Sequence, residues 1–373
     1  MKISSASVSL VKWPFILPVE HSLARNTVTE NLVVKLTDEN GLSGYGEGIP
    51  RDYVTGETVP TALDGLKTSL LPLILDREID QVQAFGFLKN NLQSEQIDRW
   101  PSAACAVESA LLDLAGRISG LPFSKLIGLP SEKDLTYTAV IPVTEPKELE
   151  EILSLVHKLK VSEVKVKVGL EGDLELVTFL RRNLGPEIKL RIDANGAWSA
   201  ETAVEKIKEM EPLVITSVEQ PVAKNDIDGL AKVKSMVGPL VLADESACTP
   251  KEVSHLIETG AVDGFNLRLS KNGGPARTLE MLDMASKAGL VCQLGCQVGE
   301  LGILSAAGRH FASTQPELIH LEGSLTRFFI SQDIIDEDLT PGPFGKASPL
   351  TKPGLGITVR ESTLADYHLF TLP

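Results

Sequence analysis

Cysteine is scarce in this sequence, with four among 373 residues. They are too few and too widely spaced for a disulfide framework in a chain of this length. Two of them form a C-x3-C motif in the apolar string VCQLGC, which we interpret as half-buried strand cysteines rather than a zinc site. The four are Cys105, Cys248, Cys292 and Cys296.

Long apolar runs and an excess of basic charge are also absent. No run of about 18 uncharged apolar residues occurs, which argues against a membrane-spanning helix. The formal net charge is −14, whereas a nucleic-acid-binding protein needs a basic stripe, so nucleic acid is not expected as a partner. With 43% hydrophobic and 23% charged residues, the composition is typical of a soluble globular protein.

Residues 1–20 show no export signal. A lysine interrupts their apolar stretch, apolar and polar residues alternate, and no small-residue cleavage site follows. We interpret this segment as the first strand of the fold and expect a cytoplasmic protein.

The N-terminal part, residues 1–125, has the pattern of an α+β domain. Its string LVVKLTDENGLSGYGEG predicts two strands joined by a turn at Asn40-Gly41, and residues 60–75 have helical periodicity. A further helix is expected to begin with Ser102 as its N-cap and to end at Gly120.

After residue 134 the chain alternates between short apolar strings and amphipathic helical stretches. Eight such units indicate a parallel (β/α) barrel more than an open sheet, and a barrel of roughly 250 residues leaves room for a second, smaller domain. The tail after residue 340 should rejoin the N-terminal part. The predicted strands are LTYTAVIPV, VSEVKVKVG, IKLRIDANG, LVITSVEQPV, PLVLADESA, VDGFNLRLS, LVCQLGCQV and ELIHLEG.

A polar residue interrupts five of these strands at intervals of 24 to 26 residues, about the length of one βα unit. The carboxyl ends of the strands of a parallel barrel meet on one face, so these side chains should converge there. They are Lys167, Asp193, Glu219, Asp244 and Arg268.

The three acids of this set predict a site for one divalent cation. Three carboxylates in a dry barrel mouth would repel one another unless a cation lay among them. Oxygen ligands without histidine or cysteine favour Mg2+, or Mn2+ as its substitute. Each acid alone could instead pair with a lysine or arginine or cap a helix, but the common register of all three favours the metal site.

Lys165 and Lys167 lie two residues apart in VKVKVG, so both point to the same side of one strand. Desolvation and the neighbouring like charge should lower the pKa of each of these lysines, which moves a lysine toward being a neutral base near pH 7. The apolar neighbours make a solvated strand face the weaker interpretation.

An ordered set of motifs resembles the enolase superfamily and, within it, the muconate-lactonizing-enzyme (muconate cycloisomerase) subgroup. The resemblance covers nearly the whole chain. Its motifs are GYGEG at 44–48, the alanine-rich helix at 103–116, K-x-K at 165–167, D-x-N at 193–195, VEQP at 218–221, ADES at 243–246, KNGG at 271–274 and PGLG at 353–356.

The resemblance implies a modified (β/α) barrel of the TIM type with an α+β capping domain built from both chain ends. The expected parts are an N-terminal capping domain at 1–125, the barrel at 126–335 and a returning segment at 336–373. A homo-oligomer is also expected, because homo-oligomers are common in the family that the chain resembles.

The resemblance also implies roles for individual residues. Mg2+ would bind Asp193, Glu219 and Asp244, and the substrate would be a small carboxylate that loses its α-proton through a metal-stabilised enediolate. Lys167 matches the acid/base position and Lys165 its pKa-lowering partner. Asn195 would support the metal ligands, and Glu245 would shape the electrostatics of the cavity.

One position departs from the subgroup. The sixth strand usually carries N-x-K-x-x-K-x-G-G, and here Arg268 replaces the first lysine, which is the catalytic one. Arginine hardly accepts a proton but can hold a carboxylate. We therefore predict one-base chemistry, a cycloisomerase or dehydratase. The alternative, a racemase or dipeptide epimerase using Lys167 and Lys271, is disfavoured because strand alternation places Lys271 opposite Arg268, unless the chain has already turned into the loop at that point.

Substrate specificity is expected from cap loops and from the seventh and eighth units, where GCQVGELG departs from the usual small-Met-x-Glu-Ser pattern. His310 and His320 belong to no recognisable His-Asp dyad, and we interpret them as core or surface residues. The candidate specificity residues are Arg25, Arg51, Tyr53, Lys271, Gln297, Glu300 and Glu322.

A hypothesis of another class is a barrel that binds carboxylates without catalysis. The Lys165–Lys167 pair argues against it, since two adjacent buried cations have no evident structural use.

Overall fold

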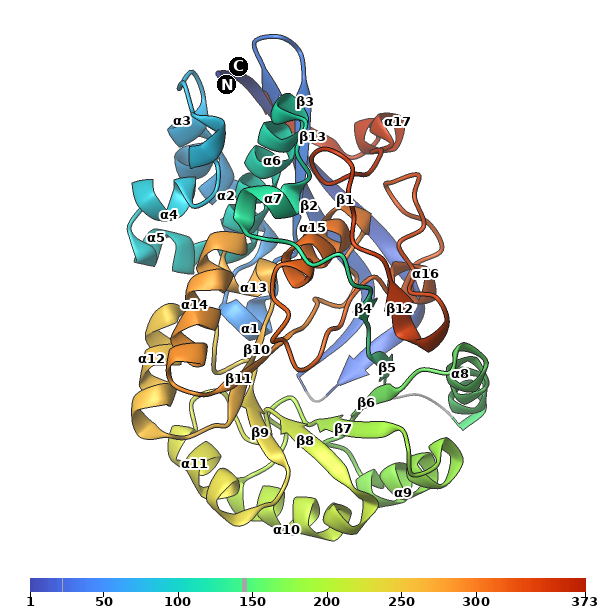
Figure 1. The fold of residues 1–373 in the computed structure, drawn as a ribbon. Helices are drawn as coiled ribbons and strands as arrows, with labels where there is room; N and C mark the ends of the chain where they lie inside the picture. Colours follow the sequence, from blue (N-terminus) through green and yellow to red (C-terminus); the bar gives the residue numbers. More distant parts are fainter. Residues whose placement is uncertain (22, 143–145) are drawn as a thin grey trace.

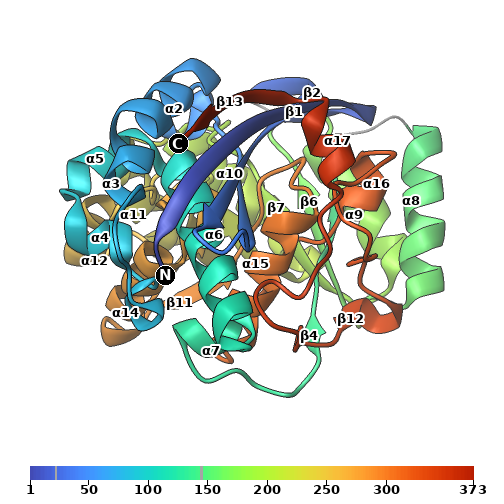
Figure 2. The same cartoon turned by 90° about the horizontal axis from the view of Figure 1, so that it is seen from above.

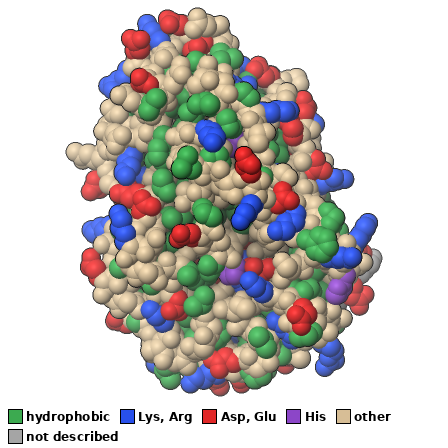
Figure 3. All heavy atoms as spheres, viewed as in Figure 1, with side chains coloured by type: hydrophobic (Ala, Val, Ile, Leu, Met, Phe, Trp, Pro, Cys, Tyr) green, Lys and Arg blue, Asp and Glu red, His purple; other side chains and the backbone are tan. Residues whose placement is uncertain are grey.

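The computed structural model describes residues 1–21, 23–142 and 146–373. Figure 1 shows a cap at the top, to which both chain termini belong, and a curved sheet wrapped by helices below it. Within the described ranges, no helix combines the length and the apolar character that crossing a bilayer requires. Acidic and basic side chains are interspersed over the face seen in Figure 3.

The cap sheet is antiparallel, with the strand order β13-β1-β2-β3. Strand β2 pairs with β3 across the turn at Asn40-Gly41, which confirms the predicted hairpin. Ala6 of β1 pairs with Leu372 of β13, so the C-terminal tail does return to the N-terminal part. The strands are β1 (Ile3–His21), β2 (Ala24–Asp38), β3 (Ser43–Gly48) and β13 (His368–Leu372).

Helix α6 (Pro101–Ser119) packs on this sheet and is almost entirely buried. It begins at Pro101 with Trp100 at the N-cap, so the prediction of a Ser102 cap was wrong; proline fits the first helical position, where its missing N–H costs nothing. The helix ends at Gly120, as predicted. The other cap helices are α1 (Asp52–Thr55), α2 (Val59–Gly65), the π-turn η1 (Leu66–Leu70), α3 (Leu71–Ile74), η2 (Gln81–Gln83), α4 (Phe87–Asn91), α5 (Ser94–Arg99) and α7 (Phe123–Ile127).

The second sheet is the expected barrel sheet, with seven parallel strands in the order β5 to β11 within the described part of the chain. Helices cover the outside of this sheet. In the view from above, α8 lies at one edge of the molecule and the cap helices α2 to α5 lie at the opposite edge (Figure 2). The strands are β5 (Ala139–Ile141), β6 (Glu163–Lys167), β7 (Lys189–Asp193), β8 (Ile215–Glu219), β9 (Leu240–Ala243), β10 (Gly264–Leu267) and β11 (Val291–Leu294).

The helices that follow the barrel strands alternate with them along the chain, as in other (β/α) barrels. A small two-stranded ribbon, β4 with β12, lies beside the barrel. These elements are α8 (Pro146–Leu159), α9 (Asp173–Leu184), α10 (Ala200–Met210), η3 (Glu211–Leu213), α11 (Ile227–Met236), α12 (Pro250–Thr259), α13 (Leu269–Asn272), α14 (Pro275–Lys287), α15 (Gly302–Ser313), α16 (Thr326–Phe329), α17 (Glu361–Ala365), η4 (Pro343–Gly345), β4 (Leu135–Thr136) and β12 (Lys346–Ala347).

The eighth predicted strand, ELIHLEG, is not a regular strand. It makes one parallel bridge, Leu294 to Leu321, and Glu322 N–H donates to Leu294 O at 2.8 Å. On its other side Thr138 N–H donates to Leu321 O at 2.8 Å, so the segment still closes the ring between β11 and β5. Val143, the last residue of the first predicted strand, lies outside the described residues.

The barrel interior is polar rather than aliphatic. Lys165 of β6 is the register partner of Arg191 on β7, and Asn266 of β10 is the partner of Gln293 on β11. All four side chains are buried. The alternate residues of the same strands, such as Val164 and Val166, belong to a hydrophobic cluster with the surrounding helices.

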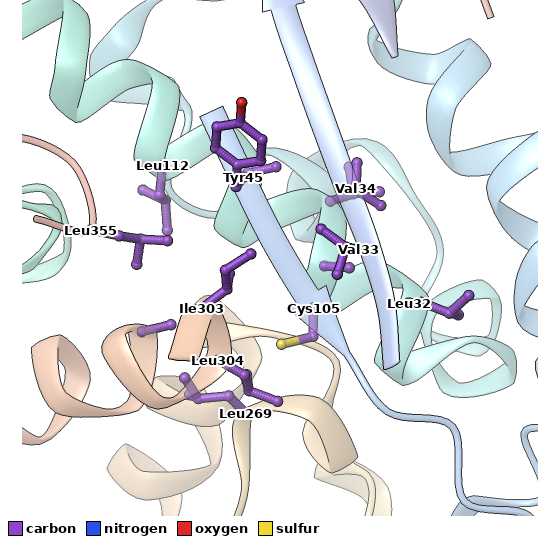
Figure 4. Close-up of a cluster of buried hydrophobic side chains, with 14 of the residues drawn as sticks. Leu32, Val33, Val34, Tyr45, Cys105, Leu112, Leu269, Ile303, Leu304 and Leu355 are labelled. Atoms are coloured by element: carbon purple, nitrogen blue, oxygen red, sulfur yellow. The ribbon is translucent and has the colours of Figure 1, made fainter. Parts of the chain in front are cut away.

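The described residues of the cap share a hydrophobic core with part of the barrel domain. One cluster includes cap residues such as Val34 and Leu112 together with Leu269 of α13 and Ile303 of α15 (Figure 4). This shared core fixes the cap over the carboxyl ends of β10 and β11. The domain boundaries at 125 and 335 stay predictions.

Candidate active site

Three carboxylates lie at the carboxyl ends of consecutive strands. Asp193 ends β7 and is the register partner of Glu219, which ends β8. Asp244 directly follows β9. Their side chains are at most 1% exposed. The barrel thus brings together residues that are 25 or 26 positions apart in sequence.

Two lysines of β6 contact these carboxylates from one side. Lys167 Nζ lies 2.5 Å from Asp193 Oδ2 and donates to Asn195 Oδ1 at 2.8 Å. Lys165 Nζ lies 3.1 Å from Glu219 Oε2 and 2.8 Å from Glu322 Oε2. Both lysines therefore face the carboxylates, as the two-residue spacing indicated.

The electrostatic expectation for the lysine pair was wrong for Lys165. Burial lowers the pKa of Lys165, but the charges of Glu219, Glu322 and Asp193 outweigh burial and leave the pKa above its usual value. Lys165 is therefore a fixed cation among the carboxylates. The sequence argument considered the like charge of Lys167 and overlooked the acids on the neighbouring strands.

On the other side, strand β10 ends at Leu267 and the chain turns at once into α13, with Arg268 at its N-cap. Lys271 is in this helical turn, and its Nζ donates to Asp244 Oδ1 at 2.9 Å and to the carbonyls of Asp244 and Asn266, both at 2.7 Å. Arg268 and Lys271 both contact Asp244, so strand alternation does not separate them; the chain has already turned after β10, the exception that the sequence argument allowed.

Arg268 and Lys271 differ in exposure. Arg268 forms an ion pair with Asp244, donates to Gln297 Oε1 at 3.1 Å, and is 8% exposed. Lys271 is fully buried, and burial together with the charge of Arg268 lowers the pKa of Lys271 to about 8.

Asn195 and Glu245 link the two sides. Asn195 Nδ2 donates to Glu245 Oε1 at 2.9 Å, and Asn195 N–H donates to Asp193 Oδ1 at 3.0 Å. Glu245 is buried, and burial and the nearby Asp193 charge raise the pKa of its carboxyl. Glu245 Oε2 has no hydrogen-bond partner among the described residues.

A cavity of about 50 Å3 opens above these groups. Its walls include Lys165, Lys167 and Arg268, together with Gln297 and Glu300 from the loop after β11. Burial raises the pKa of Glu300 to about 8. Of the specificity candidates, Gln297, Glu300 and Glu322 line this cavity.

Apart from Lys271, which lies in α13, the remaining specificity candidates lie in the cap. Arg51 NH2 donates to Val298 O at 2.7 Å and so ties the cap to the loop after β11. Arg25 lies in β2 and Tyr53 in α1, and neither is among the described residues that line the cavity.

The two histidines lie in the protein interior, as interpreted. His310 of α15 is fully buried, and His320 Nδ1 lies 2.6 Å from Glu163 Oε1.

The sequence analysis did not identify three residues of the site, namely Arg191, Asn266 and Gln293. Glu219 accepts from Asn266 Nδ2 at 2.6 Å and from Gln293 Nε2 at 2.7 Å. Arg191 donates to Gln293 Oε1 at 2.7 Å and to Glu322 Oε1 at 2.9 Å. Arg191 precedes Asp193 by two residues and Asn266 precedes Arg268 by two, so strand alternation could have found them.

The donor set suits a hard divalent cation, since it offers buried carboxylate oxygens and no sulfur or imidazole. In this structure the carboxylate oxygens form ion pairs with four basic side chains, those of Lys165, Lys167, Arg268 and Lys271. Within the described ranges no three acidic, histidine or cysteine side chains are grouped as a ready metal cluster. Binding of a cation would require these ion pairs to rearrange.

Comparison with protein families gives two matches. Residues 4–128 match the mandelate racemase / muconate lactonizing enzyme N-terminal domain, and residues 148–363 match the enolase C-terminal domain-like family.

Curated relatives include epimerases, racemases and cycloisomerases. The hydrophobic dipeptide epimerase of Enterococcus faecalis is 32% identical over 294 residues, 78% of this chain and 80% of the relative. The N-succinyl-L-Arg/Lys racemase of Bacillus cereus is 28% identical over 99% of both chains. Muconate cycloisomerase 1 of Rhodococcus opacus is 26% identical over 96% of both chains.

Solved structures of two of these relatives superpose along most of the chain. The Bacillus cereus racemase has a TM-score of 0.89 at 27% identity, covering 100% of this chain and 99% of that chain. The Enterococcus faecalis epimerase, in complex with Mg and the dipeptide L-Leu-L-Tyr, has a TM-score of 0.86 at 29% identity and covers 96% of this chain and 100% of that chain.

Proposed function

Because this chain belongs to the mandelate racemase/muconate lactonizing enzyme family of the enolase superfamily, we propose that it racemises or epimerises the α-carbon of a small carboxylate. The relatives are isomerases, and so is this enzyme; the hypothesis of a non-catalytic barrel finds no support. The proposed substrate is an amino-acid derivative with a free carboxylate, such as a dipeptide or an N-acylamino acid.

One observation carries this proposal: Lys167 and Lys271 flank the three carboxylates from opposite ends. Lys167 lies beside Asp193 on β6, and Lys271 lies beside Asp244 in α13. Inversion at carbon needs a proton acceptor on one face and a proton donor on the other. The turn that starts at Arg268 supplies the second amine, in place of the lysine that Arg268 replaces.

The proposed cation would be held by Asp193, Glu219 and Asp244. When bound, Mg2+ supplies positive charge opposite the negative charge that develops on the substrate carboxylate. In one direction of the reaction Lys167 Nζ takes the α-proton and Lys271 Nζ delivers a proton to the opposite face. Arg268 keeps its charge throughout and orients the carboxylate. Asn195 positions Lys167 through the bond to Oδ1.

A second candidate is the one-base reaction expected from the sequence, a cycloisomerisation or a dehydration. Arg268 lines the cavity, whereas Lys271 is not among the described residues that line it. That observation favours Lys167 as the sole base and Arg268 as a cationic stabiliser.

Deuterium exchange separates the two candidates. The enzyme with Mg2+ is incubated in D2O with dipeptides, N-succinyl and N-acylamino acids, acid sugars and muconate, and α-proton loss is followed by NMR. Two-base chemistry predicts that Lys167→Ala abolishes exchange from one stereoisomer and Lys271→Ala from the other. Lys189→Ala, at an exposed position starting β7, is the control. If Lys271→Ala retains interconversion of the isomers, the two-base proposal is wrong.

A further inference from the structure

A second cavity adjoins the catalytic one. It has a volume of about 210 Å3 and lies between α8, β5 and the segment that contains α16. Val140, Leu325 and Phe329 line both cavities, so the two cavities lie side by side and share a wall.

The wall of this second cavity is apolar. Helix α8 contributes side chains three and four residues apart, which is the spacing of one helix face. Phe328 and Phe329 of α16 and Pro341 form part of the lining as well. The α8 side chains are Ile152, Leu155, Val156 and Leu159.

None of the described residues that line this cavity carries a charge. The two lining hydroxyls already have partners, since Thr138 Oγ1 donates to Glu163 Oε1 at 3.0 Å and Tyr137 OH accepts from Arg309 Nε at 3.4 Å. The catalytic cavity, in contrast, is lined by five charged residues, namely Lys165, Lys167, Arg268, Glu300 and Glu322. The catalytic cavity is therefore lined by charged groups, and the cavity beside it is apolar.

We propose that the apolar cavity binds the distal group of the substrate whose carboxylate occupies the catalytic cavity. The substrate is then an amphipathic carboxylate, with an aliphatic or aromatic group on the side away from the reacting carbon. Burial of apolar surface favours such a group, whereas a charged one would lose its hydration without gaining a partner. The position of the reacting carbon in this inference rests on the proposed function.

The inference is tested with three N-acyl-L-alanines that differ only in the acyl group: acetyl, hexanoyl and succinyl. Affinity in the presence of Mg2+ is measured by calorimetry, and α-proton exchange is measured separately in D2O. One methylene in an apolar pocket changes affinity by roughly tenfold or more, so hexanoyl-alanine should bind at least ~10-fold more tightly than the other two.

Leu155→Trp fills the cavity and should abolish the preference for hexanoyl while leaving the affinity for acetyl-alanine unchanged. Ile152→Trp carries the same expectation if Leu155→Trp does not fold. Leu240→Trp is the matched control, because Leu240 is 39% exposed at the start of β9 and does not line either cavity.

The two proposals fail in different ways. Equal affinity for hexanoyl- and succinyl-alanine, or a hexanoyl preference that survives both tryptophan variants, overturns the cavity assignment even if exchange occurs. A hexanoyl preference that the tryptophans remove, without exchange from any ligand, supports the cavity assignment and overturns the proposed function.

Discussion

At the residue scale, the site is an assembly of buried charges that neutralise one another. Glu219 shows the principle: its two oxygens accept from Lys165, Asn266 and Gln293 at 2.6 to 3.1 Å. Arg268 and Lys165 outweigh the burial of Glu219 and hold the pKa of its carboxyl well below the usual range. A buried carboxylate with this many donors stays ionised, which is the state in which a carboxylate binds a cation.

Glu219→Gln should remove most of the stabilisation of the protein by Mg2+. A cation present at about 100 times its dissociation constant stabilises the folded state by about 2.7 kcal/mol, and loss of one ligand charge removes most of this. Thermal unfolding is measured with and without Mg2+. Glu322→Gln is the control, because Glu322 also pairs with Lys165 but is not one of the proposed ligands. An undiminished Mg2+ shift in Glu219→Gln would contradict the metal assignment.

At the element scale, the cap depends on close contact between β3 and α6. Gly44, Gly46 and Gly48 alternate along the strand, so all three face the same side. A Cβ on Gly46 would lie 1.9 Å from Ala106 O, and one on Gly48 would lie 2.0 Å from Ser102 O. Only hydrogen atoms fit between these backbones, which is the physical reason for the GYGEG motif.

Gly46→Ala should therefore destabilise the protein by about 3 kcal/mol or more, because a backbone and not a flexible side chain stands in the way. Denaturant unfolding followed by circular dichroism measures this. Gly308→Ala in α15 is the control: a Cβ there meets nothing within 4 Å, and replacing a helical glycine should stabilise by about 0.5–1 kcal/mol. A neutral Gly46→Ala would mean that β3 and α6 are not in contact.

At the scale of the whole molecule, the cap and the barrel are held together at a few buried points. Glu47 of β3 accepts from Leu301 and Leu304 N–H, both at 2.8 Å, where α15 begins. His310 near the end of α15 joins two further segments: its Nδ1 accepts from Ser124 N–H at 3.4 Å, and its Nε2 donates to Leu355 O at 3.1 Å.

The bond from Ser124 N–H requires neutral His310, and burial lowers the pKa of His310 to about 4. The folded pKa is below the unfolded value of about 6.5, so the stability that neutral His310 contributes is complete above pH 6.5. It is lost as the pH falls toward 4, by about 3 kcal/mol.

The measurement is the difference in unfolding free energy between the parent protein and His310→Asn at several pH values. It should shrink between pH 7 and 4, whereas the difference for His255→Asn, at an exposed position of α12, should stay constant. A pH-independent difference for His310→Asn would refute the assignment. The difference between parent and variant is used because other groups also change the unfolding free energy with pH. Burial raises the pKa of Glu57 to about 7, so its contribution to stability rises as the pH falls, opposite to that of His310.

The sequence by itself determined the family, the barrel and the ring of strand-end residues. Regular spacing of polar residues is sufficient for this, because residues that are one βα unit apart in sequence lie on adjacent strands of a closed parallel barrel. Asp193, Glu219 and Asp244 lie at adjacent strand ends for that reason, and Lys165 and Lys167 face them because strand residues two apart share a side.

The tertiary structure decided those features of the site that depend on the residue at which an element ends and on the side chains that pack against it. Lys271 reaches Asp244 because β10 ends at Leu267, a boundary that the periodic pattern does not mark. The high pKa of Lys165 and the apolar cavity beside α8 come from side chains on several strands and helices. Such contacts are set by three-dimensional packing between distant segments, whereas spacing along the chain sets only the order of neighbours around the barrel.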